Sequence, residues 1–376
     1  MNVDASLAPS AQPTPSRPVS AHLAPLDGIR AAAVILVLFS HSVIFGEFPA
    51  LHEVGLMSGY NGICLFFVLS GYLITRLLIR EEDRFGDVSL KLFYLRRAVR
   101  LFPALWLYLA VVVVIWSQGH IPDHPGYSFL SSLLYLRNIV GRGVETHHLW
   151  SLSVEEQFYL LWPIVFIALA RKHLARLAVC FAVVVLVVTW RWYAWREQMA
   201  NAGQLYIRSD FRFDSPLIGC AIALVERVRP RVTAAFNSSR WRSDIFCLLG
   251  GAGIAVWTAY QLHYGQVLSV DSTIVSLLSG IIVCSQIGPA RGWAGRLLSC
   301  RPLVFLGKIS YGVYLWQGLF VGHATGIFAQ IRVLPWNLTA TFAVALLSYY
   351  LLERPLLRYK DRSLHRRTTN TPVGAG

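Results

Sequence analysis

Ionisable side chains occur inside long apolar segments of this chain, where each is costly unless it has a partner. The segment LDGIRAAAVILVLFSHS carries His41 eleven residues after Arg30, and HHLWSLSVEEQFYLLWP carries Glu155 near its start. At a helical rise of about 1.5 Å per residue, His41 and Glu155 are each expected about 9 Å from the same end of a helix bundle. A carboxylate beside an imidazole fixes its tautomer and makes it a general base, so this pair could catalyse a proton transfer.

Each of these residues also has an ordinary structural interpretation. Arg30 can extend its guanidinium from a helix end toward lipid headgroups, His41 can hydrogen-bond to a neighbouring helix, and Glu155 can form a helix-end salt bridge. We favour catalysis for His41 and Glu155, because their spacing places them at one depth. For Arg30 both interpretations stay open.

A basic cluster precedes another apolar segment, in FYLRRAVRLFPALW. Arg97 and Arg100 are three residues apart, so they share one helix face and could hold a multivalent anion. The phosphates of a cytosolic cofactor would be such a ligand. Membrane topology alone also concentrates Arg and Lys at cytoplasmic helix ends, so this second interpretation stays open.

Two further charges lie in RSDFRFDSPLIG, at the predicted outer start of a span. Arg212 and Asp214 are two residues apart and so do not face each other on a helix. We expect them to line the outer mouth of a cavity, although most charges in such loops are merely solvated.

The elements that position these residues are predicted to cross a membrane. Of the 376 residues, 55% are hydrophobic and 14% are charged, whereas soluble domains carry about 25% charged residues. The mean hydropathy is +0.51, and apolar stretches of about 20 residues recur along the chain. The ten candidate spans are 26–47, 60–80, 99–117, 149–170, 177–195, 213–227, 245–263, 270–288, 303–322 and 335–353. The segment 127–136 is too short to cross and is interpreted as interfacial or re-entrant.

The distribution of basic residues predicts the orientation. The formal net charge is +14, but Lys and Arg lie in short runs between apolar segments, which argues against a nucleic-acid-binding surface. With the N-terminus in the cytoplasm, 27 of the 34 Lys and Arg residues fall on the inner side. The predicted fold class is therefore all-α: a polytopic membrane bundle of about ten transmembrane helices with both termini cytoplasmic.

The ends of the chain differ from this membrane domain. Residues 1–24, rich in Ala, Pro and Ser, are interpreted as a disordered tail and not as a signal peptide. Residues 25–358 form the predicted membrane domain, and 359–376 a basic cytoplasmic tail. The six cysteines show no CxxC and no regular spacing, so they are interpreted as small apolar residues and no metal is expected.

Six segments together resemble a known family. In chain order they are LDGIRAAAVILVLFSHS, GICLFFVLSGYLIT, LRRAVRLFPALW, LWSLSVEEQFYLLWP, FLGKISYGVYLW and LLERP. They are similar to motifs of the acyltransferase-3 family of bacterial membrane O-acyltransferases, over roughly residues 25–358. The resemblance implies a ten-helix domain of the bacterial cytoplasmic (inner) membrane that transfers an acyl group, commonly acetyl, from cytosolic acyl-CoA. The implied acceptors are hydroxyls of O-antigen, exopolysaccharide, peptidoglycan or Nod factor, or of a macrolide.

The resemblance also implies roles for individual residues. The family's His and Glu match His41 and Glu155, and its cofactor-binding arginines match Arg30, Arg97 and Arg100. The residues expected to bind the substrates are Asp27, Ser70, His148, Arg212, Asp214, Tyr311 and Gln317. Many members have a His where this chain has Gln317, so a mechanism that needs a second imidazole there is not expected.

The expected mechanism is acid–base catalysis. Acyl-CoA binds from the cytoplasm with its phosphates on Arg97 and Arg100, and its thioester reaches His41. His41, oriented by Glu155, takes the proton as the acceptor hydroxyl attacks; a covalent acyl-histidine is the other possibility. No extracytoplasmic hydrolase-like domain is expected after the last span, so we expect the acceptor to reach the membrane domain itself.

A transporter or flippase for a glycan or small molecule is the alternative function, because buried Arg, His and Glu also suit a proton relay. Against it, the spans show no clear inverted repeat, and few are interrupted by paired Gly and Pro. A purely structural membrane protein would leave the buried polar groups without an explanation.

Overall fold

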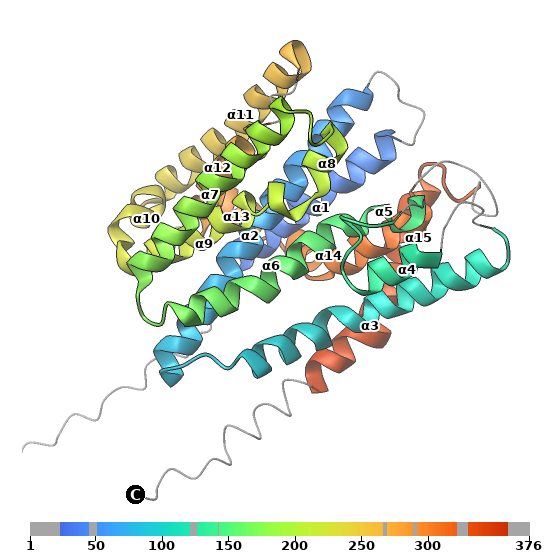
Figure 1. Cartoon of the computed structure of the whole chain (residues 1–376), viewed down its shortest axis with the longest axis horizontal. Helices are drawn as coiled ribbons and strands as arrows, with labels where there is room; N and C mark the ends of the chain where they lie inside the picture. The colour runs from blue at the N-terminus through green and yellow to red at the C-terminus, as the bar shows by residue number, and fades with distance from the viewer. Residues whose placement is uncertain are drawn as a thin grey trace, which may run out of the picture.

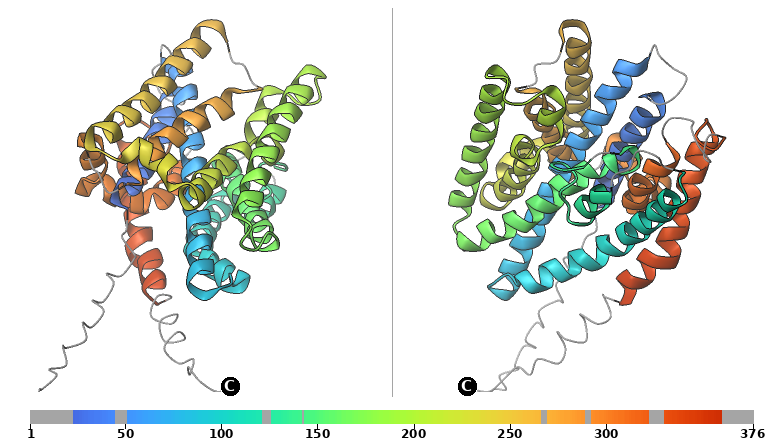
Figure 2. Two further views of the ribbon diagram at one scale, coloured as in Figure 1. Left: turned by 90° about the vertical axis from the view of Figure 1, so that its left-hand side faces the viewer. Right: turned by 45° about the vertical axis from the view of Figure 1, so that its right-hand side comes forward.

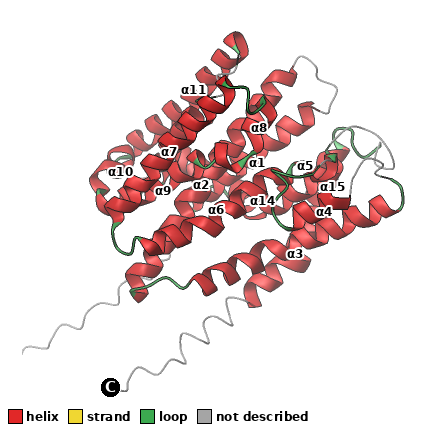
Figure 3. Ribbon diagram, in the orientation of Figure 1, coloured by secondary structure: helices red, strands yellow, loops and turns green. Residues whose placement is uncertain are grey.

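A computed structural model describes residues 23–44, 51–120, 126–141, 143–265, 269–288, 292–321 and 330–359. The expectations for the two tails and for the end of the first span therefore fall almost entirely outside the described residues. Across the described residues the chain is helical and contains no strand (Figure 3). The predicted all-α class is confirmed.

The main helices follow the predicted spans. Their bounds are α1 Ala24–Ile44, α2 His52–Phe85, α3 Leu90–Ser117, α6 Leu149–Ala168, α7 His173–Arg196, α9 Asp214–Val228, α11 Arg240–Tyr264, α12 Asp271–Gln286, α14 Arg301–Phe320 and α15 Trp336–Ser348, continued by the π-helical turn η4 Tyr349–Glu353. Shorter elements are α4 Gly126–Leu133, α5 Val144–His147, α8 Ala202–Ile207, η2 Ser209–Phe211, α10 Pro230–Asn237 and α13 Trp293–Leu298. Each predicted span overlaps one main helix, and the segment 127–136 overlaps the short helix α4.

Five helices of the described residues are long and apolar enough to cross a membrane. They are Ala24–Ser42, His52–Phe85, Leu90–Ser117, His173–Arg196 and Arg240–Tyr264. The helix α12 is also apolar but is shorter. The chain is therefore a multi-pass membrane protein, whereas the number of ten crossings and the cytoplasmic position of both termini stay predictions.

The distribution of side chains differs from that in a soluble protein. Large apolar side chains face outward, among them Phe181 and Val256, which are 72% and 70% exposed. The largest fully buried side chains are those of Arg176, Arg191 and Arg212. An apolar exterior suits contact with lipid tails, and cations in the interior need partners from neighbouring helices.

The helices α1 and α2 form the centre of the bundle (Figures 1 and 2). The helix α1 packs along α2 and along α14, and α2 packs also along α9. In Figure 1, α7, α9, α11 and α12 lie on one side of the central pair, and α3, α14 and α15 lie on the other. The central helices therefore carry the polar residues of their sequence motifs into the interior.

The contact between α2 and α9 depends on glycine at two positions. A Cβ at Gly71 would collide with the carbonyl group of Pro216, and a Cβ at Gly219 would collide with the carbonyl group of Val68. The two backbones therefore touch directly, as small residues allow between helices in membranes. This close approach fixes the position of α2 next to the start of α9.

Two buried ion pairs hold α7 against the bundle. Arg176 donates to both carboxylate oxygens of Glu82 on α2, at 2.8 and 2.7 Å. Arg191, on the same helix, forms a salt bridge with Asp214 of α9 at 3.0 Å. Removing one partner would leave a buried charge, which is strongly destabilising.

Replacing Gly219 with Leu is expected to separate α2 from α9, because no side chain fits between the two backbones. Overpacking of this kind costs about 1–3 kcal/mol, so the variant should melt at a lower temperature than wild type after purification in detergent. Gly251 on α11 provides the control, since nothing lies within 4 Å of the position of its Cβ. Equal melting temperatures for Gly219→Leu and Gly251→Leu would contradict the direct backbone contact.

Candidate functional site

Five arginines surround one pocket between α1, α2 and α3. They are Arg30 of α1, Arg76 and Arg80 of α2, and Arg97 and Arg100 of α3. The pocket encloses about 900 Å³, part of it open to solvent, and we call it the basic pocket. Asp27, Ser70 and Tyr159 also line it. The three arginines predicted to bind a cofactor therefore share one pocket, which contains two further arginines.

The arginines of the basic pocket differ in how far their charge is compensated. Arg30 donates to Asp27, three residues earlier on α1, at 3.2 Å. Arg76, Arg80 and Arg100 form no salt bridge within the part of the chain that the structure describes. A concave site with uncompensated guanidinium groups favours a multivalent anion such as a phosphate chain.

Arg97 contacts two carboxylates of α6. Its Nη2 is 3.5 Å from Oε1 of Glu155, and its Nε is 3.6 Å from Oε1 of Glu156. The guanidinium also stacks on the ring of Tyr159, with Cζ 3.3 Å from the ring centroid. Ion pairing and the cation–π contact together hold Arg97 in place. Arg97 is thus bound by the protein itself, unlike Arg100.

Glu155 is the centre of this cluster. Its Oε1 accepts a hydrogen bond of 2.6 Å from Ser70 Oγ of α2, and another from the hydroxyl of Tyr159, one turn further along α6. Together with Arg97, these contacts join α2, α3 and α6 at one point. Ser70, Arg97 and Glu155 come from distant parts of the sequence, and the fold brings them together here.

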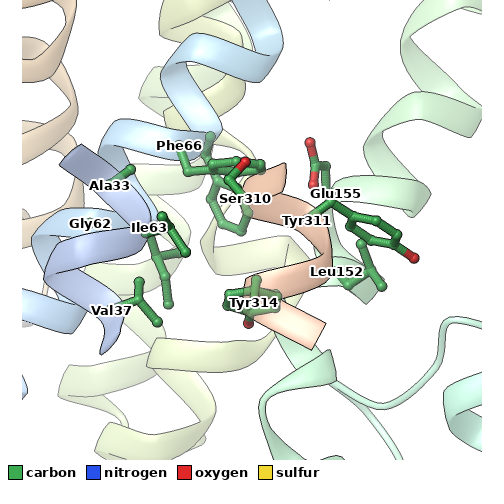
Figure 4. Close-up of a pocket in the computed structure, with 13 residues that line it drawn as sticks. Ala33, Val37, Gly62, Ile63, Phe66, Leu152, Glu155, Ser310, Tyr311 and Tyr314 are labelled. Atoms are coloured by element: carbon green, nitrogen blue, oxygen red, sulfur yellow. The ribbon is translucent and has the colours of Figure 1, made fainter. Parts of the chain in front are cut away.

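A second pocket begins beside Glu155 and is apolar (Figure 4). It is a narrow cavity of about 40 Å³ between α1, α2, α6 and α14. Its lining includes Ala33, Val37, Ile63, Leu152, Tyr311 and Tyr314. The hydroxyl of Tyr311, a predicted substrate-binding residue, donates to the carbonyl oxygen of Leu101 at 2.8 Å, so its ring is fixed as a wall. Glu155 is therefore shared by this apolar pocket and the cluster that lines the basic pocket.

His41 lies one helical turn after Val37, on the same face of α1, beyond the apolar pocket. Its Nδ1 is 3.1 Å from Oε1 of Gln317 on α14. An amide oxygen only accepts hydrogen bonds, so Nδ1 carries the proton and Nε2 keeps its lone pair. Gln317 is 1% exposed, and its burial keeps the imidazole in one orientation.

The expected contact between Glu155 and His41 is not found. No hydrogen bond or ion pair joins the two among the described residues, and His41 hydrogen-bonds instead to Gln317. The depth estimate was wrong because α6 does not begin at the surface of the bundle. His148, directly before α6, is buried, with Nε2 3.1 Å from the carbonyl oxygen of Leu315. His148 therefore lies near the level of His41, and Glu155 follows about 10 Å further along α6.

Arg212 and Asp214 do not lie at a solvated cavity mouth. Asp214 is fully buried, and its carboxylate binds Arg191 of α7 and Thr273 of α12, at 3.0 and 2.5 Å. Arg212 is also buried, among aromatic rings. The spacing of charges within one loop could not indicate Arg191 as a partner, because it comes from another helix.

Several residues of the site were missed by the sequence analysis. Arg76 and Arg80 are four residues apart in TRLLIR, and Tyr159 follows Glu155 by four. Both spacings place the two side chains on one helix face, and this spacing could have indicated that they belong to the site. Single arginines near a helix end are common in membrane proteins, so that signal is weak.

Comparison with known proteins identifies relatives of the chain. The family model described as an acyltransferase domain, that of the acyltransferase-3 family, matches residues 23–354. Peptidoglycan O-acetyltransferase OatA of Listeria monocytogenes is 28% identical over 358 residues, which cover 88% of this chain and 55% of that protein. YrhL of Bacillus subtilis, provisionally named a peptidoglycan O-acetyltransferase, is 29% identical over 372 residues, which cover 91% of this chain and 56% of YrhL.

A Staphylococcus aureus protein, provisionally named an O-acetyltransferase, is 27% identical over 375 residues, which cover 92% of this chain and 59% of that protein. The chain thus spans little more than half the length of these curated relatives. No solved structure matches the chain. The family model matches most of the chain in one stretch, and the protein therefore belongs to the acyltransferase-3 family.

Proposed function

We propose that this protein is an O-acetyltransferase of the bacterial cytoplasmic membrane, which moves an acetyl group from acetyl-CoA to a hydroxyl of a cell-envelope carbohydrate. One observation carries the proposal: the basic and apolar pockets meet at the Glu155 cluster, and His41 lies beyond the apolar pocket. The name peptidoglycan O-acetyltransferase, given to a relative, supports the class of acceptor.

The basic pocket suits the phosphates of coenzyme A. Arg76, Arg80 and Arg100 offer guanidinium groups without a salt bridge in the described residues, and charge-assisted hydrogen bonds to phosphate are strong. The excess of Lys and Arg in the loops on the predicted inner side supports a pocket that opens to the cytoplasm, where acyl-CoA is available. Fatty acyl chains and acetyl would enter by the same path, and the relatives favour acetyl.

The apolar pocket suits the remainder of the donor. Arg30 and His41 are eleven residues apart on α1, a distance of about 16 Å along the helix. The pantetheine arm would cross this distance between Ala33 and Val37 of α1 and Tyr314 of α14. Apolar walls exclude water and so protect the thioester from hydrolysis.

His41 is the proposed general base. Its Nε2 takes the proton of the acceptor hydroxyl while the hydroxyl oxygen attacks the thioester carbonyl. The new C–O bond of the ester forms, the C–S bond breaks, and the imidazolium returns its proton to the leaving thiolate. Gln317 keeps Nδ1 protonated, so that the lone pair that takes the proton is on Nε2.

Glu155 is proposed to position Arg97 rather than His41. Its carboxylate is 3.5 Å from Arg97 and accepts a hydrogen bond from Ser70. These residues form the boundary between the two pockets, and the donor must pass along them. Glu155 is therefore proposed to determine the shape and charge of the boundary between the two pockets.

The variant His41→Ala is expected to lower acetyl transfer at least 100-fold, because a positioned base contributes roughly 100- to 10,000-fold. Transfer of radiolabelled acetyl from acetyl-CoA to peptidoglycan fragments is measured in vesicles that contain the full chain. The control is His263→Ala, an exposed histidine at the end of α11. Near-normal transfer by correctly inserted His41→Ala would reject the proposal.

Gln317→Leu tests the tautomer argument. It removes the acceptor of the Nδ1 proton, so we expect kcat to fall about tenfold, the effect of a hydrogen bond worth about 1.4 kcal/mol. The KM for acetyl-CoA should stay unchanged. Gln317→Glu, which keeps an acceptor oxygen but adds a charge, should recover part of kcat; equal loss in both variants would contradict this role.

Arg100→Ala tests the donor site. A charge-assisted hydrogen bond contributes about 1.5–3 kcal/mol, so the KM for acetyl-CoA should rise roughly 10- to 100-fold. Arg84→Ala is the control, because Arg84 is an exposed arginine at the end of α2 and does not line the basic pocket. If both variants change KM equally, the effect comes from net charge, and the proposed phosphate site is wrong.

A further inference from the structure

Arg212 is a buried cation without a salt bridge in the described part of the chain. It is 1% exposed, and its Nη2 donates to Sγ of Cys64 at 3.3 Å. Its Nε is buried and has no hydrogen-bond partner among the described residues. A guanidinium removed from water is strongly disfavoured unless it is paired and hydrogen-bonded.

The acidic residue nearest in sequence, Asp214, forms no salt bridge with Arg212 in the described part of the chain. Asp214 forms a salt bridge with Arg191 at 3.0 Å, and it accepts hydrogen bonds from Ser272 and Thr273 at 3.0 and 2.5 Å. Its carboxylate is thus occupied on the side of α7 and α12. Arg212 therefore keeps hydrogen-bonding capacity that an external anion would satisfy.

Aromatic rings surround the guanidinium of Arg212. Its Cζ lies 4.9 Å from the ring centroid of Tyr60, 5.7 Å from that of Tyr206 and 5.8 Å from that of Phe67. Tyr60 and Tyr206 stack at 5.4 Å, and the ring of Trp150 lies 4.8 Å from that of Tyr206. Tyr60 and Tyr206 are partly exposed, so they form the outer edge of this group, which we call the aromatic–arginine site.

The aromatic–arginine site lies beside the proposed reaction centre. Phe67 belongs to it and also lines the apolar pocket. Gly59, next to Tyr60 in α2, packs directly against Ser40, the residue before His41 in α1. A molecule held by Arg212 would therefore lie close to the proposed base, on the side of α1 that faces α2.

We propose that Arg212 binds the carboxylate of an acidic sugar acceptor while Tyr60 and Tyr206 pack against the sugar ring. This inference rests on the proposed function and narrows its acceptor to carbohydrates that carry a carboxylate. A planar guanidinium binds a carboxylate through parallel hydrogen bonds, and aromatic faces offer rigid apolar contact area. A neutral sugar leaves Arg212 unpaired, so the site discriminates against it.

The test measures sugar binding to the purified full chain. The rise in melting temperature is titrated with methyl glucuronide, and with methyl glucoside as the neutral probe. Wild type is expected to bind the glucuronide at least tenfold more tightly. Arg212→Met should bring the two affinities together, and Arg212→Lys should keep part of the preference. Arg208→Met is the control, since Arg208 lies in the same loop, is partly exposed and pairs with Asp210 at 2.8 Å.

A structural role of Arg212 would give a different result. Met is apolar and unbranched, so Arg212→Met should melt no lower than wild type when no sugar is present. A marked loss of this ligand-free stability would overturn the inference. Equal affinity of wild type for the two glycosides would overturn it as well.

Acetyl transfer from acetyl-CoA is measured on the same samples, so that the two proposals can fail separately. If glucuronide binding depends on Arg212 but wild type shows no acetyl transfer, the result would support the anion site and contradict the acetyltransferase function. Transfer to both glycosides with equal KM would keep the function and reject the acidic acceptor. Transfer with a KM at least tenfold lower for the glucuronide, lost in Arg212→Met, is the expected result.

Discussion

The pairing of Arg97 with Glu155 is the interaction on which the rest of the site depends. Inside a membrane bundle a carboxylate or a guanidinium needs a partner, and here each provides one for the other, 3.5 Å apart. The hydrogen bond from Ser70 adds α2 to this contact between α3 and α6. Because the three helices meet at one charged point, the basic pocket on one side and the apolar pocket on the other adjoin there.

The arginines discussed above fall into two groups. Arg176 and Arg191 each form a salt bridge with a carboxylate of another helix, and they hold α7 in place. Arg100 and Arg212 form none within the described residues; Arg212 is fully buried, whereas Arg100 is exposed in the basic pocket. A buried charge without a salt bridge is tolerated where a ligand can complete it, and an exposed one can bind an anion from solution, so these two positions are where we propose the acceptor and the donor to bind.

The proposed chemistry lies between these two positions. His41 hydrogen-bonds to Gln317, a neutral residue. In the proposed mechanism the donor reaches His41 through the apolar pocket, and the acceptor reaches it from the aromatic–arginine site. Gln317 controls which nitrogen carries the proton without bringing a further charge into the membrane interior, where a second ion would be costly. The direct contact between α1 and α2 at Gly59 keeps the two sites close together.

The sequence by itself determined the helical fold, the membrane character and the shared face of Arg97 and Arg100, because hydrophobic length and three-residue spacing are local properties. The ionisable residues inside apolar segments also identified the candidate site, since such residues are expensive without a function. Only the tertiary structure decided the partners of those residues. The depth of Glu155 depends on where α6 begins inside the bundle, and the preceding segment buries His148 there. Helix spacing measures distance along one helix and contains no information on the offset between two helices. The spacing therefore could not show that His41 hydrogen-bonds to Gln317 and not to Glu155.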